Sequence, residues 1–176
     1  KGNTVFLQAP DVKNGVGGLR DYQGILWMAK VKFNLEDLNG LIDKKYLTEQ
    51  EAKSFEEAYS FLLRVRNELH FRSTRPVDTL HLEKQPEIAQ GLGYPQEDIF
   101  RRVEAFMGDY YTKAQSIHQI CGILEERLVH ANSGNTSKLS FRNVLNAYRS
   151  PPIQKVDKFD LIEDTLISPD PNIFDD

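Results

Sequence analysis

The chain has 176 residues, of which 40% are hydrophobic and 27% charged, and its formal net charge is -4 at pH 7. This length supports one domain with a buried core and a short appended segment. The acidic balance argues against a general nucleic-acid binder, and no apolar run is long enough to span a bilayer. The single cysteine, Cys121, excludes an internal disulfide. We therefore expect a cytoplasmic protein with no nucleic-acid or membrane partner.

The first half of the chain predicts two long helices. Residues 4–10 form a short apolar patch, which we interpret as a strand remnant or an extended lead-in. Apolar residues then recur at helical spacing and predict a first helix over 19–33. A short segment over 35–42 leads to Thr48 and Glu51, whose spacing is that of a capping box. This box predicts the start of a second helix that continues to Phe71.

The second half predicts one short helix and the longest element of the chain. Residues 74–82 are expected to be irregular, 83–90 to form a short helix and 91–95 to break it. Apolar positions then alternate steps of four and three over 97–131, which predicts one long helix. Such a stripe fits a coiled-coil dimer or an internal bundle seam. We favour the seam, because the chain has other amphipathic helices to pack against, and we expect Cys121 to lie in the core.

Residues 132–176 lack the long amphipathic helices predicted for the rest of the chain. A polar connector over 132–137 precedes one or two helical turns over 141–147, and the pattern over 159–167 predicts a small β-hairpin. The tail that follows is expected to lead into a further domain, so we expect the chain to be part of a longer protein. The predicted fold is mainly α: an antiparallel helical bundle over 1–131, then a connector, short helix and hairpin or irregular tail over 132–176.

The junction before the first helix is the main candidate site. Three glycines within four positions run directly into Arg20 and Asp21, with Lys13 just upstream. Glycines allow a close backbone approach, and the first amides of the following helix are expected to point outward unpaired. With the two cations, that geometry would suit a phosphate. The alternative is a tight turn in which Arg20 and Asp21 pair with each other or cap neighbouring helices.

A second cluster lies near the end of the second predicted helix. Arg66 and His70 are four residues apart and therefore share one helix face. They either converge on an anion, or Arg66 pairs with Asp21 or Asp78 while His70 caps the helix end. No catalytic set and no metal-ligand spacing is found. The candidate nucleotide-binding or domain-interface residues are Lys13, Gly15, Gly17, Gly18, Arg20, Asp21, Arg66 and His70.

Three separated segments carry a family pattern: 15–21 with Trp27, then 61–70, then 85–94 followed by 103–111. In this order they resemble the helical domain of bacterial PII uridylyltransferase/uridylyl-removing enzymes. A more distant similarity is to the adenylyltransferase that modifies glutamine synthetase. The resemblance implies a parent enzyme with a nucleotidyltransferase domain before this one, and with phosphohydrolase and glutamine-sensing domains after it.

The same resemblance implies a function for the parent. It would transfer UMP from UTP, with Mg²⁺, to a tyrosine of the PII signalling protein according to nitrogen status. This chain has neither the Gly-Ser and paired-aspartate motif nor the His-Asp motif of those catalytic domains. We therefore expect the fragment to be inactive alone and to bind no cofactor tightly. The alternatives are a helical interaction module that docks the PII-like acceptor or relays regulation, and a nucleotidyltransferase with another acceptor.

Overall fold

The computed structural model describes residues 5–130, 154–156, 159–162 and 165–167. The chain divides into two compact units, Lys1–Thr136 and Ser137–Asp176. The described elements, in chain order, are α1 (Leu19–Phe33), α2 (Leu38–Asp43), α3 (Glu49–Phe71), α4 (Gln85–Gly91), α5 (Ile99–His130), β1 (Gln154–Val156), β2 (Phe159–Ile162) and β3 (Thr165–Ile167). The prediction of a mainly α-helical chain is confirmed.

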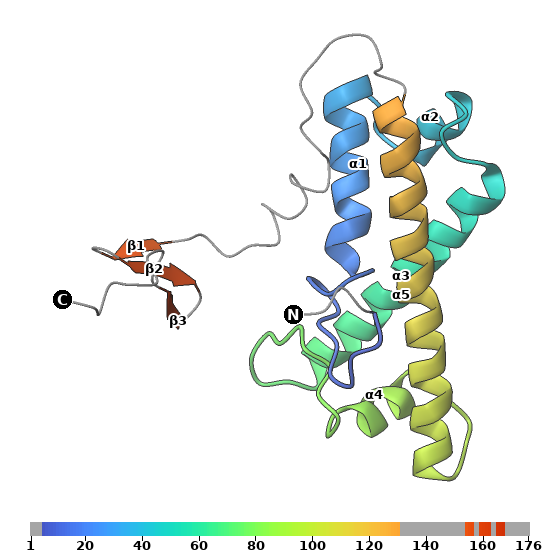
Figure 1. The fold of residues 1–176 in the computed structure, drawn as a ribbon. Helices are drawn as coiled ribbons and strands as arrows, with labels where there is room; N and C mark the ends of the chain where they lie inside the picture. Colours follow the sequence, from blue (N-terminus) through green and yellow to red (C-terminus); the bar gives the residue numbers. More distant parts are fainter. Residues whose placement is uncertain (1–4, 131–153, 157–158, 163–164, 168–176) are drawn as a thin grey trace. The chain divides into compact units, whose positions relative to one another are not determined.

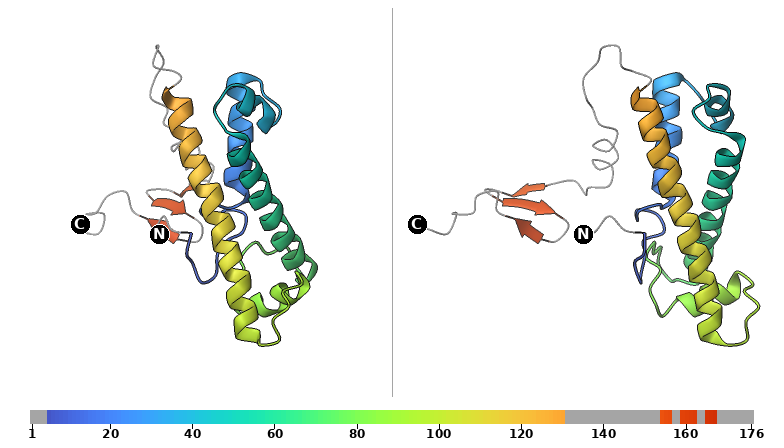
Figure 2. Two further views of the ribbon diagram at one scale, coloured as in Figure 1. Left: turned by 90° about the vertical axis from the view of Figure 1, so that its right-hand side faces the viewer. Right: turned by 45° about the vertical axis from the view of Figure 1, so that its right-hand side comes forward.

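The first unit is a bundle built around its three long helices. α3 packs against both α1 and α5, and α1 also packs against α5. α1 and α5 run in one direction and α3 runs in the opposite direction, so that helices consecutive in this bundle are antiparallel (Figures 1 and 2). α4 packs against α5 and α3 at the end where α5 begins. The predicted antiparallel bundle is therefore confirmed.

The core of the bundle lies along the inner stripe of α5. The stripe starts in the second turn of the helix and continues over five turns, as the three-four spacing predicted. Its buried members are Phe106, Met107, Tyr110, Ala114, Ile117, Ile120, Cys121 and Leu124. They pack against α1, α3 and α4, so the stripe is an internal seam. The Cys121 side chain is 5% exposed, which confirms the prediction that it belongs to the core.

Local signals set the helix ends. The Thr48 hydroxyl accepts a hydrogen bond from the Glu51 amide at 3.2 Å, and the Glu51 carboxylate accepts one from the Thr48 amide at 2.7 Å, which confirms the capping box. α1 ends at Phe33 and is followed by the C-cap Asn34, whose left-handed φ is 54°. No secondary structure was predicted for the short segment over 35–42, and Asp37 caps α2 there by accepting from the Gly40 amide.

The second unit contains three short strands in the order β1-β2-β3, both pairs antiparallel. Leu161 of β2 lies opposite Gln154 on one side and Leu166 on the other. The hairpin predicted over 159–167 falls on β2 and β3. The predicted connector over 132–137, the helical turns over 141–147 and the tail over 168–176 lie outside the described residues.

Candidate functional site

The glycine junction is a compact loop that folds onto the start of α1. The Leu19 amide donates to the Val12 carbonyl and the Arg20 amide to the Lys13 carbonyl, each at 3.0 Å. The Asp21 amide donates to a carbonyl of the loop as well, at 3.1 Å. The expectation that these amides point outward unpaired is therefore wrong, because the preceding loop supplies their acceptors. An anion at this end of α1 would have to be bound by side chains.

Asp21 holds the loop from inside the bundle. Its side chain is 2% exposed, and its carboxylate accepts a hydrogen bond from the Gly17 amide at 2.8 Å. A carboxylate buried at the start of a helix also interacts favourably with the helix dipole. Asp21 thus fixes the turn, and the structural interpretation of this residue has direct support.

The glycines are required by close backbone contacts. Gly17 has a φ of +71°, and a methyl group there would collide with the carbonyl oxygen of Ala114 in α5. A methyl group at Gly15 would meet the carbonyl of Asp11, and one at Gly18 would lie 2.8 Å from the carbonyl oxygen of Gly15. The glycine pattern therefore lets the loop press against α5 and close on itself.

Asp78 gathers three of the predicted site residues. Its carboxylate lies 2.7 Å from the Arg66 guanidinium, 3.0 Å from His70 Nε2 and 3.9 Å from Lys13 Nζ. The Asp78 carbonyl also accepts from the Val12 amide at 2.8 Å. We call Lys13, Arg66, His70 and Asp78 the Asp78 cluster. It ties the glycine junction to the last turns of α3 and to the segment that follows α3.

The electrostatics of the cluster favour an ionised Asp78. Partial burial raises the pKa of Asp78, but hydrogen bonds from Arg66 and His70, with the charges of Arg66 and Lys13, outweigh it and lower that pKa overall. The carboxylate is therefore negative at neutral pH. An anion that approached Arg66 or His70 would meet this charge, so the structure supports the alternative in which Arg66 pairs with Asp78.

Lys13, Arg66 and His70 of the Asp78 cluster were predicted as site residues, but Asp78 itself was not. Asp78 appeared only as one possible partner of Arg66, because it lies in a segment without periodicity. Arg20 is half-buried in the first turn of α1. Among the described residues, no group of histidine, cysteine and acidic side chains could hold a metal ion. The described helices include none with the length and apolarity that a membrane span requires.

Fold and site together define a helical-bundle domain. Its first helix starts from a glycine-rich loop that the Asp78 cluster joins to the end of α3. Residues 1–125 match the family GlnD PII-uridylyltransferase. The chain belongs to this family.

Curated relatives agree with this membership. The chain is 36% identical over 145 residues to the bifunctional uridylyltransferase/uridylyl-removing enzyme of Pseudomonas entomophila, covering 80% of this chain and 16% of that protein. It is 33% identical over 130 residues to the enzyme of that name from Rhodospirillum rubrum, covering 72% of this chain and 14% of that protein. The chain thus spans about a sixth of the length of these relatives. No solved structure matches it.

Proposed function

We propose that this chain is the helical portion of a cytoplasmic uridylyltransferase that transfers UMP from UTP to a PII-like signalling protein in nitrogen regulation. The observation that carries the proposal is the family match over residues 1–125. The printed name of the relatives, bifunctional uridylyltransferase/uridylyl-removing enzyme, supports it. We assign both reactions to neighbouring nucleotidyltransferase and phosphohydrolase domains, because this chain carries neither catalytic motif.

The residues that the structure describes do not fit a role in holding Mg²⁺. The described residues include no cluster of ligands for a metal ion, and the carboxylates of Asp21 and Asp78 are engaged within the fold. The metal would therefore bind in the neighbouring catalytic domain, together with UTP. The contribution of this chain is positive charge at the boundary with that domain.

Lys13 and Arg20 carry this contribution. The Lys13 side chain is 38% exposed and belongs to the glycine-rich loop, and Arg20, whose amide donates to the Lys13 carbonyl, lies in the first turn of α1. Arg66 and His70 contact the Asp78 carboxylate, which also lies near Lys13. Cations held in advance at a fixed position stabilise the charge on a transferring nucleotidyl group without the cost of reorganisation. The rigid junction would thus present Lys13 and Arg20 to the triphosphate side of the catalytic domain.

Uridylyl-transfer kinetics of the full-length protein test this role. We expect Arg20→Ala and Lys13→Ala each to lower kcat/KM for UTP by about tenfold or more, while KM for the PII-like acceptor is unchanged. Lys30→Ala is the matched control, because Lys30 lies in the last turn of the same helix. Unchanged UTP kinetics in both junction variants, with folding intact, would contradict the proposed role of the junction.

A second candidate is an interaction module that binds the acceptor or relays regulation without touching nucleotide. It is favoured by one observation: the amides at the start of α1 are all used by the loop and offer nothing to a phosphate. The same kinetics separate the two functions. A docking role predicts that surface substitutions raise KM for the acceptor protein and leave KM for UTP unchanged.

A further inference from the structure

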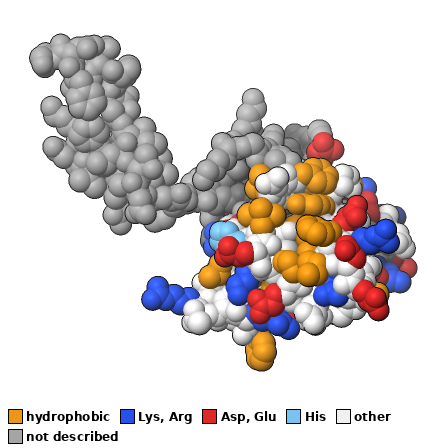
Figure 3. Space-filling model, turned by 90° about the horizontal axis from the view of Figure 1, so that it is seen from below, with side chains coloured by type: hydrophobic (Ala, Val, Ile, Leu, Met, Phe, Trp, Pro, Cys, Tyr) orange, Lys and Arg blue, Asp and Glu red, His pale blue; other side chains and the backbone are white. Residues whose placement is uncertain are grey.

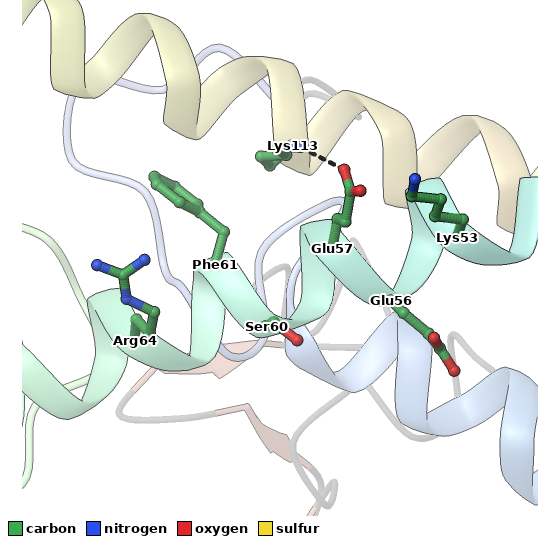
Figure 4. Close-up of a pocket in the computed structure, with 7 residues that line it drawn as sticks. All are labelled: Lys53, Glu56, Glu57, Ser60, Phe61, Arg64 and Lys113. Atoms are coloured by element: carbon green, nitrogen blue, oxygen red, sulfur yellow. Dashed lines mark hydrogen bonds and ion pairs between the residues drawn. The ribbon is translucent and has the colours of Figure 1, made fainter. Parts of the chain in front are cut away.

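An open groove follows α3 on the face beside α5 and α4. It consists of two adjoining hollows of 510 Å³ and 350 Å³, which share Arg64. Figure 4 shows the first hollow, with Lys113 contributed by α5. The first is lined by Lys53, Glu56, Glu57, Ser60, Phe61, Arg64 and Lys113, and the second by Arg64, Asn67, Glu68, Phe71, Gly91 and Leu92. None of these residues belongs to the glycine junction or to the Asp78 cluster.

Of the cations that line the groove, Lys53 lies in the first turns of α3, Lys113 lies in α5, and Arg64 lies where the two hollows meet. Lys113 pairs with Glu57 at 3.5 Å, and Glu68 pairs with Arg72. Arg64 is exposed and makes neither a hydrogen bond nor an ion pair with any residue that the structure describes, although its charge acts on the Tyr94 hydroxyl. A guanidinium offers several donors in a planar fork that matches a carboxylate.

Apolar side chains lie on both sides of Arg64. Phe61 is half-buried in the first hollow, and in Figure 4 it extends from the same side of α3 as Arg64. Phe71, in the second hollow, is 88% exposed, and Leu92 lies beside it. Figure 3 views the unit from the end that carries α4 and shows hydrophobic side chains gathered between charges of both signs. Phe61 and Phe71 therefore offer apolar surface on either side of Arg64 that a partner could cover.

We propose that this groove binds a helical segment of a partner protein that places a carboxylate between two apolar side chains. The carboxylate would pair with Arg64, while the apolar side chains would cover Phe61 and Phe71. The line from Lys53 to Phe71 is about 27 Å long at the helical rise, which matches a partner helix of about 18 residues. An amphipathic helix in a groove is a recurring mode of recognition, with aromatic and arginine anchors supplying most of the affinity.

A peptide-display library of random sequences of about 18 residues, selected on the 176-residue chain, is the direct test. We expect the enriched peptides to carry Asp or Glu with large apolar residues three or four positions away on either side. A synthetic peptide of that pattern should bind Arg64→Glu at least about tenfold more weakly than the unsubstituted chain. Replacing its acid by lysine should restore binding to Arg64→Glu.

Two matched controls sit outside the groove. Arg101→Glu reverses an exposed arginine at the start of α5, and Phe100→Ala removes an aromatic side chain that is 84% exposed. We expect both to leave peptide affinity unchanged, whereas Phe71→Ala should weaken it. All four positions are exposed, so the variants should keep the circular dichroism spectrum of the fold. The proposal is overturned if no acidic pattern is enriched, or if Arg64→Glu and Arg101→Glu bind the peptide equally.

Discussion

Replacing Gly17 by alanine tests whether the glycine junction is held by its contact with α5. The substitution adds one methyl group and makes two separate demands on the fold. Gly17 has a φ of +71°, a conformation that costs an alanine about 1–2 kcal/mol. The methyl group would also collide with the backbone carbonyl of Ala114, and overpacking of this kind costs about 1–3 kcal/mol. We therefore expect Gly17→Ala to lower the free energy of unfolding by about 2–5 kcal/mol.

Two other glycines separate these contributions. Gly93 has a φ of +86° with no atom within 4 Å of an added methyl group, so Gly93→Ala carries the conformational cost alone, about 1–2 kcal/mol. Gly108 lies inside α5 with similarly open surroundings, so Gly108→Ala should stabilise the fold by about 0.5–1 kcal/mol. The difference between the Gly17 and Gly93 variants therefore measures the collision with α5.

Urea unfolding followed by circular dichroism gives the three values on one scale. A shift of the midpoint at constant slope reports a change in stability without a change in the surface exposed on unfolding. The expected order of stability is Gly108→Ala, the unsubstituted chain, Gly93→Ala, then Gly17→Ala. The reasoning is refuted if Gly17→Ala costs no more than Gly93→Ala, because α5 would then yield to the loop without strain.

Three further predictions follow from the contacts of the fold. Asp78→Asn should cost about 1–3 kcal/mol at neutral pH, since it leaves Arg66 and His70 without their carboxylate. Because the folded chain lowers the pKa of Asp78, its contribution is present above the unfolded-state value of about 3.9 and is lost as pH falls through the folded value. The stabilities of Asp78→Asn and the unsubstituted chain, measured from neutral pH downward, should therefore begin to approach each other only below about pH 4, and a difference that stays constant in acid would contradict the assignment. Thr48→Ala should cost about 1 kcal/mol in urea unfolding by removing the cap of α3, and an unchanged midpoint would show that Glu51 and Arg127 hold this end unaided. Leu62→Ala, at a fully buried position of α3, should cost about 2–5 kcal/mol, and a value below about 1 kcal/mol would mean that the core collapses around the change.

The parts of the fold that depend on local pattern were predictable from the sequence. α1 was predicted at its observed bounds, and the start of α3 was predicted from its capping box. Both signals, the spacing of apolar residues and the cap residues, depend only on neighbours a few positions away in the chain. α2 was missed although Asp37 offered a cap, since a helix of six residues shows too little periodicity to be recognised.

The sequence identified most residues of the candidate site but not how they are arranged. The sequence marked Lys13, Arg66 and His70, but their convergence on Asp78 depends on how the segment after α3 pairs with residues 10–12, ahead of α1. The role of Gly17 depends likewise on a contact with a helix almost a hundred positions away in the chain. Such contacts are set by tertiary packing and leave no mark in local spacing. The amides of α1 were wrongly expected to be unpaired for another reason, since the acceptors come from the fold of the loop just before the helix.

Titration calorimetry of UTP with Mg²⁺ into the full-length protein, with ATP as the competing nucleotide, shows whether the glycine junction contributes to nucleotide binding. We expect UTP to bind in preference to ATP, Arg20→Ala to weaken this binding by about tenfold, and Lys30→Ala to leave it unchanged. If UTP binds the Arg20 variant as tightly as the unsubstituted protein, the glycine junction is structural alone. The docking function would then become the better account of this domain.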